Sequence, residues 1–212
     1  MGYFAGGDLS LDSKGNLYGL TQQGGNVSCG NGIGCGVAYK LWRFNGWKET
    51  VLHAFAGGND GAAPSGGALA FDSKGNLYGG TAIGGGIGCS AGLGCGTVFK
   101  LASGVSGWRE TVIHQFGNGS KGADPSGGLV FDQAGNAYGT AGAGGGMQCV
   151  CGAVYKLVPG ANGQWKYSVL HAFNGDDGNT PSGLMVDAVG NLYGTTVLGG
   201  PGTQGVVFEI TP

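Results

Sequence analysis

GGALAFDSKGNLYG, at residues 66–79, recurs with small changes along the whole chain. Its other copies begin at residues 6, 127 and 182 and read GGDLSLDSKGNLYG, GGLVFDQAGNAYG and SGLMVDAVGNLYG. The aspartate that opens the turn falls at Asp12, Asp72, Asp132 and Asp187, at spacings of 60, 60 and 55 residues. A period of this length marks a repeat architecture, so the fold is predicted from one repeat and its copies.

The composition excludes several classes of protein. The 10 basic and 12 acidic residues form no run of either sign, which argues against a nucleic-acid or membrane-surface binder. The 52 glycines cluster between alternating apolar runs, as turn residues do in all-β proteins. No apolar run approaches the ~18 residues of a membrane-spanning helix. Residues 1–4 lack the features of a signal peptide, so we expect either a removed leader or a segment cut from a longer chain.

One repeat contains four predicted strands. Residues 68–71 and 76–81 flank the Asp72 turn, in which Gly75 is free to adopt a positive φ. After a glycine-rich loop, 84–94, the third and fourth strands are expected at 96–101 and 108–116. Four hairpin-linked strands in about 55 to 60 residues are typical of one β-propeller blade.

This frame predicts a single all-β domain, residues 1–212, that forms a β-propeller of four blades. The repeats span 6–65, 66–126, 127–182 and 183–212, and the last lacks its fourth strand. An open blade leaves an unpaired edge, which invites association. Three solutions are open: residues 1–5 pair beside Phe208, two chains join into an eight-bladed ring, or the segment belongs to a longer propeller.

Several motifs resemble the bacterial tandem-repeat proteins called GloVer-containing, or choice-of-anchor, repeat proteins. They are GNLYG with Asn16, Asn76 and Asn191, GNAYG with Asn136, CGTVFKL from Cys95, ETVLHAF from Glu49 and DGAAPSG from Asp60. The resemblance covers nearly the whole chain. It implies a secreted or surface-anchored bacterial protein and supplies no catalytic residue.

The six cysteines form three neighbouring pairs: Cys29 and Cys35, Cys89 and Cys95, Cys149 and Cys151. The fourth repeat lacks both members and has Gln204 at the second place. Cysteines that occur together and vanish together are predicted disulfide partners, each pair closing its own loop. Free or metal-bound thiols are the alternative, although the C-x5-C spacing matches no common zinc pattern. Disulfides indicate an oxidising compartment.

His53, His114 and His171 occupy one position in the predicted fourth strands, on the face of Trp47, Trp108 and Trp165. They would lie too far apart to share an ion, so we predict no metal site and a structural role with a polar partner. The recurring aromatic residues are expected to pack between blades, and a sugar-stacking platform is the alternative. These are Tyr18, Tyr78, Tyr138, Tyr193, Tyr39, Phe99, Tyr155 and Phe208.

The loops after the fourth strands, 59–65, 120–126 and 176–182, are predicted to open on the same face as the cysteine loops. Irregular, variable loops often form binding surfaces. The candidate binding residues are Asn59, Asp60, Asp124, Asp176 and Asp177. Calcium binding by Asp60, Asp176 and Asp177 is a weaker hypothesis, because no unit has the alternating oxygen ligands of a calcium loop. Otherwise no cofactor is expected.

Three functions follow, in descending order. The first is an extracellular, non-catalytic module that binds glycans through the glycine-rich loops of one face, because repeated shallow sites gain avidity together. The second is an assembly protein that recruits another chain, such as a second copy, by strand addition at the open edge. The third is a polysaccharide hydrolase or lyase, ranked last because nearly every ionisable residue recurs at a structural position and no single active site stands out.

Overall fold

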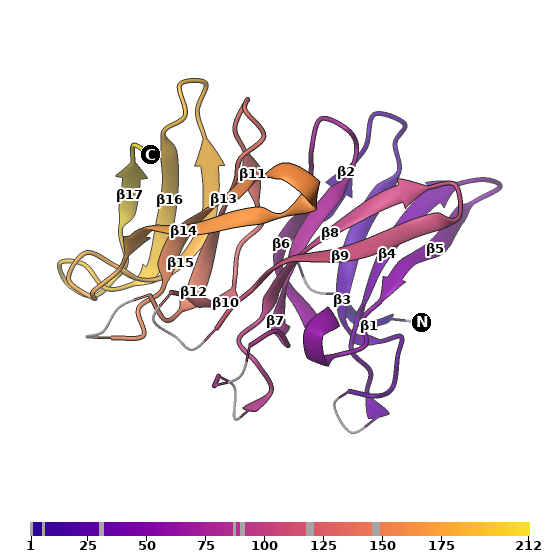
Figure 1. Ribbon diagram of the computed structural model, residues 1–212, viewed down its shortest axis with the longest axis horizontal. Coiled ribbons are helices and arrows are strands. Elements are labelled where there is room, and N and C mark those ends of the chain that lie inside the picture. Colours follow the sequence, from indigo (N-terminus) through magenta and orange to yellow (C-terminus); the bar gives the residue numbers. More distant parts are fainter. Residues whose placement is uncertain are drawn as a thin grey trace.

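The computed structural model describes residues 2–5, 7–29, 32–86, 88–89, 92–117, 121–145 and 149–212. Within these ranges the chain is all-β and forms four antiparallel sheets that follow one another along the sequence (Figure 1). They are called the first to fourth sheets, and the first to third interfaces lie between consecutive sheets. No helix among the described residues has the length and apolar character needed to cross a membrane.

The strands of each sheet follow in chain order. The first sheet contains β1 (Gly2–Ala5), β2 (Ser10–Leu11), β3 (Leu17–Gly24), β4 (Val37–Arg43) and β5 (Trp47–Ala54). The second contains β6 (Ala62–Phe71), β7 (Leu77–Ile83), β8 (Thr97–Gly104) and β9 (Gly107–Gln115). The third contains β10 (Ala123–Pro125), β11 (Val130–Phe131), β12 (Ala137–Ala143), β13 (Ala153–Pro159) and β14 (Trp165–Ala172). The fourth contains β15 (Asn179–Val186), β16 (Leu192–Leu198) and β17 (Val207–Ile210). Two short 3-10 helices, η2 (Gly58–Asp60) and η4 (Ala161–Gly163), lie between strands.

The four predicted strands of a repeat are present, but the innermost is longer than predicted. In the second sheet β6 begins at Ala62, so residues 62–65 are strand and not loop. The sheets begin at residues 2, 62, 123 and 179, four residues before the predicted repeats at 6, 66, 127 and 183. The early part was missed because it carries proline and glycine, which are uncommon inside strands.

The N-terminal strand β1 does not close a ring of sheets in the way that one of the three solutions predicted. β1 pairs antiparallel with β3, with Ala5 opposite Thr21, and therefore does not lie beside β17. It takes the place that the start of β6 takes in the second sheet, where Pro64 lies opposite Thr81. Closure of a ring by residues 1–5 pairing beside Phe208 is therefore wrong, because the first sheet needs this segment as its own inner strand.

The recurring aspartates organise the turn between the first two long strands of each sheet. Asp72 Oδ1 accepts hydrogen bonds from the backbone N–H groups of Lys74 and Asn76, and Oδ2 accepts from the Asn76 amide and the Tyr78 hydroxyl. Gly75 completes the turn with φ of 79°. Around Asp12 burial opposes ionisation, but the equivalent hydrogen bonds from Asn16, Lys14 and Tyr18 outweigh it and lower the pKa of Asp12 to about 2.

The core lies between neighbouring sheets, as predicted for the recurring aromatic residues. Tyr18 packs edge-on against Phe71 of the next sheet, at 5.3 Å between ring centroids, and Tyr78 packs likewise against Phe131 at 4.9 Å. A second series of edge-on pairs crosses each interface: Phe55 with Phe99, Phe116 with Tyr155, and Phe173 with Phe208. Such contacts contribute about 0.5 to 1.5 kcal/mol each beyond area burial.

Near the inner edge of the sheets, glycine backbones touch across the interfaces. A Cβ added to Gly67 would collide with the backbone of Gly128, and one added to Gly7 would lie 3.0 Å from the carbonyl oxygen of Gly67. The same holds for Gly127, whose added Cβ would lie 3.2 Å from the nitrogen of Gly183. Only residues without a side chain allow this approach.

Candidate functional site

The cysteine loops and the linkers that join one sheet to the next lie together, and they define the loop end of the molecule. Figure 1 shows this end opposite the aspartate turns. The second residue of each inner strand that follows a linker donates a backbone hydrogen bond of 2.8 to 2.9 Å to a cysteine carbonyl oxygen: Ala63 to Cys35, Asp124 to Cys95 and Thr180 to Cys151. The prediction that both kinds of loop open on the same side is therefore confirmed.

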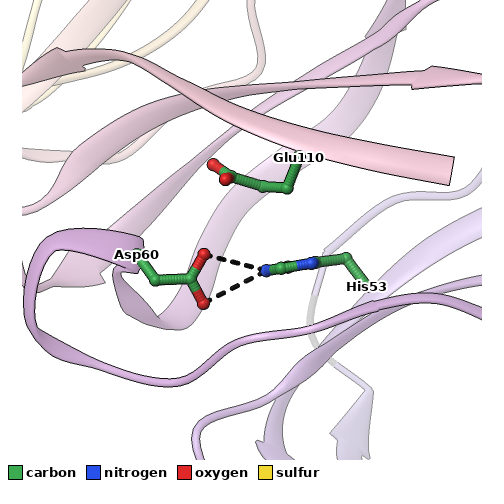
Figure 2. Close-up of side chains that lie close together, drawn as sticks. All are labelled: His53, Asp60 and Glu110. Carbon is green, nitrogen blue, oxygen red and sulfur yellow. Dashed lines mark hydrogen bonds and ion pairs between the residues drawn. The ribbon is translucent and has the colours of Figure 1, made fainter.

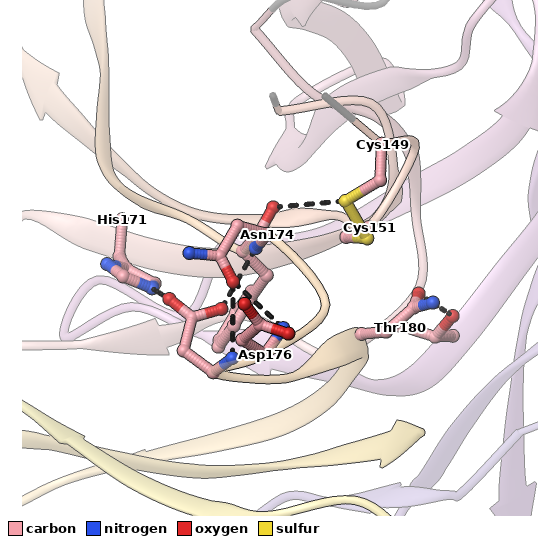
Figure 3. Close-up of a disulfide and its surroundings, with 9 residues drawn as sticks. Cys149, Cys151, His171, Asn174, Asp176 and Thr180 are labelled. Carbon is pink, nitrogen blue, oxygen red and sulfur yellow. Dashed lines mark hydrogen bonds and ion pairs between the residues drawn. A yellow bond between two sulfur atoms is a disulfide. The ribbon is translucent and has the colours of Figure 1, made fainter. Parts of the chain in front are cut away.

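All three predicted disulfides are present: Cys29–Cys35, Cys89–Cys95 and Cys149–Cys151. Figure 3 shows the last of them. Cys149 Sγ lies 3.6 Å from the carbonyl oxygen of Phe173, which begins the next linker. In the fourth sheet Gly199 and Gln204, at the place of Cys95, form a parallel bridge without a disulfide, one residue along from the Gly84–Gly94 bridge of the second sheet. The disulfides are typical of an oxidising, extracellular environment.

The predicted binding residues do not all occupy equivalent positions in the three repeats. Asp124 corresponds to Ala63 and Thr180, and all three adopt left-handed backbone conformations with φ between 48° and 55°. Lys121 corresponds to Asp60 and Asp177, since each precedes the glycine that leads into the next sheet. Asp60 and Asp177 therefore hold equivalent places, whereas Asp124 lies three residues beyond the corresponding Lys121.

Two of the histidines pair with linker aspartates. His53 Nε2 lies 3.0 and 3.1 Å from the two oxygens of Asp60, and Asp60 also accepts the backbone N–H of Ala56. His171 Nε2 lies 2.9 Å from Asp177 Oδ2. The predicted polar partner of the histidine is thus confirmed at both places. Asn59 and Asp176 are exposed beside these pairs.

Glu110 of β9 joins the first of these pairs from the neighbouring sheet. Figure 2 shows its carboxylate directed towards Asp60 and His53. One ligand atom from each of the three side chains lies within 4.8 Å of the others. Glu110 Oε1 is buried and has no hydrogen-bond partner. Burial, and then the negative charge of Asp60, raises the pKa of Glu110 to about 7.

The second interface has different chemistry at the same place. His114 stacks on Tyr167 with parallel rings 4.0 Å apart, and the Tyr167 hydroxyl donates to the carbonyl oxygen of Lys121. Burial, and then the charge of Lys121, lowers the pKa of His114 to about 4. Tyr167 holds the strand position of Glu110, since they lie opposite Leu157 and Leu101 respectively.

A pocket of about 480 Å³ lies where the inner strands converge, and we call it the central pocket. All four repeats contribute to it, through Asp8, residues 67–70, residues 126–130 and residues 182–184. Asp8 is the one ionisable side chain among these lining residues, and the rest are backbone, serine hydroxyls and small or apolar side chains. A second pocket, of about 530 Å³, lies between the second and third sheets near the aspartate turns and includes Lys100, Asp132 and Trp165.

The sequence pointed to His53 and Asp60 separately but missed Glu110 and the central pocket. Glu110 recurs as Glu49 in the first sheet, where it is exposed, so its repeat position alone carried no signal. Asp8 was missed because it breaks the repeat, where Ala68 stands in the second copy. That departure from the repeat is the signal that could have found it.

The fold and the loop-end disulfides define a glycine-rich, tandem-repeat β-sheet protein. The chain belongs to the Gloeobacter/Verrucomicrobia repeat family, whose model matches residues 4–212. No curated protein matches it.

Solved structures that are similar to this chain include the following two. One is a protein of unknown function from Dyadobacter fermentans DSM 18053, with 13% identity and a TM-score of 0.60, which matches 97% of this chain. The chain spans 65% of the length of that structure, and the likeness concerns the fold alone. The other is a putative oxidoreductase (glucose dehydrogenase) from Thermus thermophilus, with 17% identity over 99% of this chain and 85% of its own. Its TM-score of 0.36 is too low to support an inference.

Proposed function

We propose that the protein is a secreted, non-catalytic binding module whose sheets are the blades of a β-propeller and whose ligand is a glycan. The observation that carries this proposal is the central pocket, to which all four repeats contribute. Meander sheets whose inner strands meet around a common axis are the arrangement of a propeller. The disulfides support secretion, since such bonds persist in oxidising compartments.

The lining of the central pocket supports a neutral, polar ligand. Its volume of about 480 Å³ lies within the range of small-molecule sites, roughly 300 to 1,000 Å³. Ser126, Ser182 and backbone groups offer hydrogen bonds to hydroxyl groups, and Leu69 and Leu129 offer apolar contact. Glycoside hydrolysis ordinarily needs two carboxyl groups flanking the bond. Asp8 is the one carboxylate among the lining residues, which supports binding without catalysis.

A glycan array probed with the labelled protein tests this function. The wild type is expected to bind a defined set of oligosaccharides, and Asp8→Arg is expected to abolish that binding, because the longer cationic side chain would enter the pocket. Asp176→Arg, on the exposed loop end, is the matched control. Loss in Asp176→Arg alone would move the site to the loop-end residues, and a wild type that binds no glycan would contradict the proposal.

A second candidate function is assembly through the two end sheets, and the pattern of exposure favours it. Val207 of the fourth sheet is 80% exposed, whereas the corresponding Val98 and Val154 are fully buried against a following sheet. On the first sheet Leu9 is 50% exposed, whereas its counterpart Leu69 is 2% exposed. The two faces are the two halves of the interface that repeats inside the molecule.

We propose that a second copy of the chain covers them, with its first sheet against the fourth sheet of its neighbour. Such a head-to-tail contact is heterologous, so it closes only if the rotation per chain completes a ring. Light scattering after size exclusion is expected to show a dimer that Val207→Asp converts to a monomer. A wild-type particle that stays monomeric at high concentration would contradict assembly and leave glycan binding unaffected.

A further inference from the structure

Three polar side chains from two repeats meet at the first interface. His53 comes from the end of β5, Asp60 from η2, and Glu110 from the middle of β9 in the next sheet (Figure 2). One ligand atom from each lies within 4.8 Å of the other two. The group is partly buried, since the side chains of His53 and Asp60 are each 22% exposed.

Within the part of the chain that the structure describes, no lysine or arginine balances the negative charge of this group. Among the described residues, the ion pairs made by carboxylates are those of Asp60 with His53 and of Asp177 with His171, and no lysine or arginine nitrogen lies within 4.0 Å of Glu110 or Asp60. Glu110 Oε1 is buried without a hydrogen-bond partner. Buried carboxylates are ordinarily paired, hydrogen-bonded or bound to a metal ion, so this oxygen lacks its partner.

The second interface supplies an internal comparison. There the histidine is kept as His114, but Lys121 replaces the aspartate and Tyr167 replaces the glutamate. Both acidic groups are absent together, and the tyrosine hydroxyl is satisfied by the Lys121 carbonyl oxygen. Between these two interfaces the acidic residues are present or absent together, as ligands of a common cation would be. At the third interface the aspartate is kept as Asp177, bonded to His171, and among the described residues the fourth sheet has no strand at the place of β9.

We propose that His53, Asp60 and Glu110 form a binding site for one divalent transition-metal ion that bridges the first and second sheets. Imidazole with two carboxylates is a donor set for the borderline ion Zn²⁺ and also suits the harder Mn²⁺, whereas Ca²⁺ prefers six to eight oxygen ligands. Zinc bonds of about 2.0 to 2.2 Å place tetrahedral ligand atoms about 3.4 Å apart. Side-chain rotations would bring the three ligand atoms from within 4.8 Å to this spacing, and water would complete the coordination.

The orientation of the ligands supports this assignment. The backbone N–H of Ala56 holds Asp60, and Phe55 packs edge-on against the His53 ring with centroids 4.8 Å apart. Groups that fix the orientation of a ligand raise the affinity of a metal site. Without an ion, the carboxylates of Asp60 and Glu110 either repel each other or share a proton. A bound cation would attract both carboxylates instead.

The test is isothermal titration of the metal-free chain, without a histidine tag, with Zn²⁺, Mn²⁺ and Ca²⁺ in turn. The wild type is expected to bind one Zn²⁺ or Mn²⁺ per chain, more tightly than Ca²⁺, with an increase in the melting temperature. Glu110→Gln is expected to weaken binding by at least about tenfold, the loss that even an outer partner of a ligand causes. Glutamine fits the space and can donate to Asp60, so the variant should fold, which circular dichroism checks.

Glu49→Gln is the matched control, because Glu49 holds the same strand position in the first sheet and is exposed. His114→Gln controls for binding at another histidine. Loss in Glu110→Gln and His53→Gln with retention in both controls supports the site. Failure of the wild type to bind Zn²⁺ or Mn²⁺, preference for Ca²⁺, or unchanged affinity in Glu110→Gln would overturn it.

Discussion

At the first interface His53 faces two carboxylates, whereas at the second interface the corresponding His114 lies flat against Tyr167. The surrounding structure is the same at both interfaces. The inner strand that follows the linker donates a backbone N–H to a cysteine carbonyl oxygen, and an aromatic pair packs across the interface. The comparison teaches that the repeat fixes the position of three side chains but not their chemistry. The first interface carries ionisable side chains that face one another, whereas the second is joined by stacked rings.

The largest expected effect is at the stacked interface. Tyr167→Ala removes an aromatic side chain that packs on His114, Phe116 and Tyr155. We expect a loss of about 3 kcal/mol in the free energy of unfolding, because a large cavity remains. Urea unfolding followed by tryptophan fluorescence measures it. Glu110→Ala is the counterpart at the first interface, and an equal or larger loss there would contradict the distinction between the two.

Removal of a disulfide should lower the free energy of unfolding by a similar amount at the first and second interfaces, since a disulfide-closed loop lies at each of them. Cys89→Ser with Cys95→Ser is expected to cost about 2 kcal/mol, largely by loosening the unfolded chain. The loop should keep its shape, because the fourth sheet forms a similar parallel bridge without a disulfide. Thermal unfolding with and without a reducing agent checks this. A much larger loss for this pair than for Cys29→Ser with Cys35→Ser would show that the second interface depends specifically on its disulfide.

Exchange of chemistry between the interfaces tests whether the residues act as a unit. Asp60→Lys alone leaves the Ala56 N–H without its acceptor and brings a cation beside His53. Adding Glu110→Tyr should recover about 1.5 kcal/mol, within the coupling range of contacting residues. A double-mutant cycle from urea unfolding gives this coupling. Strictly additive effects would mean that the ionic and stacked arrangements are not alternatives.

The smallest expected effect concerns pH. Because the pKa of His114 is lowered to about 4 in the folded protein, the unfolded chain takes up the proton first as the pH falls. His114 therefore contributes stability above pH 6.5 that is lost between about 6.5 and 4. The loss is at most about 1 kcal/mol from pH 6.5 to 5.5. His114→Gln should reduce this slope, as measured by unfolding at several pH values, and an unchanged slope would contradict the assignment.

Much of the fold was readable because its determinants are local. The aspartate turn, the alternating strands and the paired cysteines each lie within a short stretch, so Asp72, Gly75 and Tyr78 could be placed before the structure was known. The longer inner strand was not predicted because Pro64 and the glycines that follow are residues uncommon inside strands.

The sites were harder to predict because they depend on contacts between repeats. Glu110 lies 50 residues after Asp60 in the sequence, and its counterpart Glu49 is exposed, so only the packing of the second sheet on the first distinguishes them. The central pocket is lined mainly by backbone, which leaves little trace in side-chain patterns.

The touching glycines at the inner edge have a consequence for evolution by duplication. Because Gly67 and Gly128 meet backbone to backbone, the angle between consecutive sheets is set by the main chain and not by the side chains around it. Each new copy of the repeat would then extend the same arc with unchanged curvature. Any single substitution at these glycines would alter the curvature at one joint.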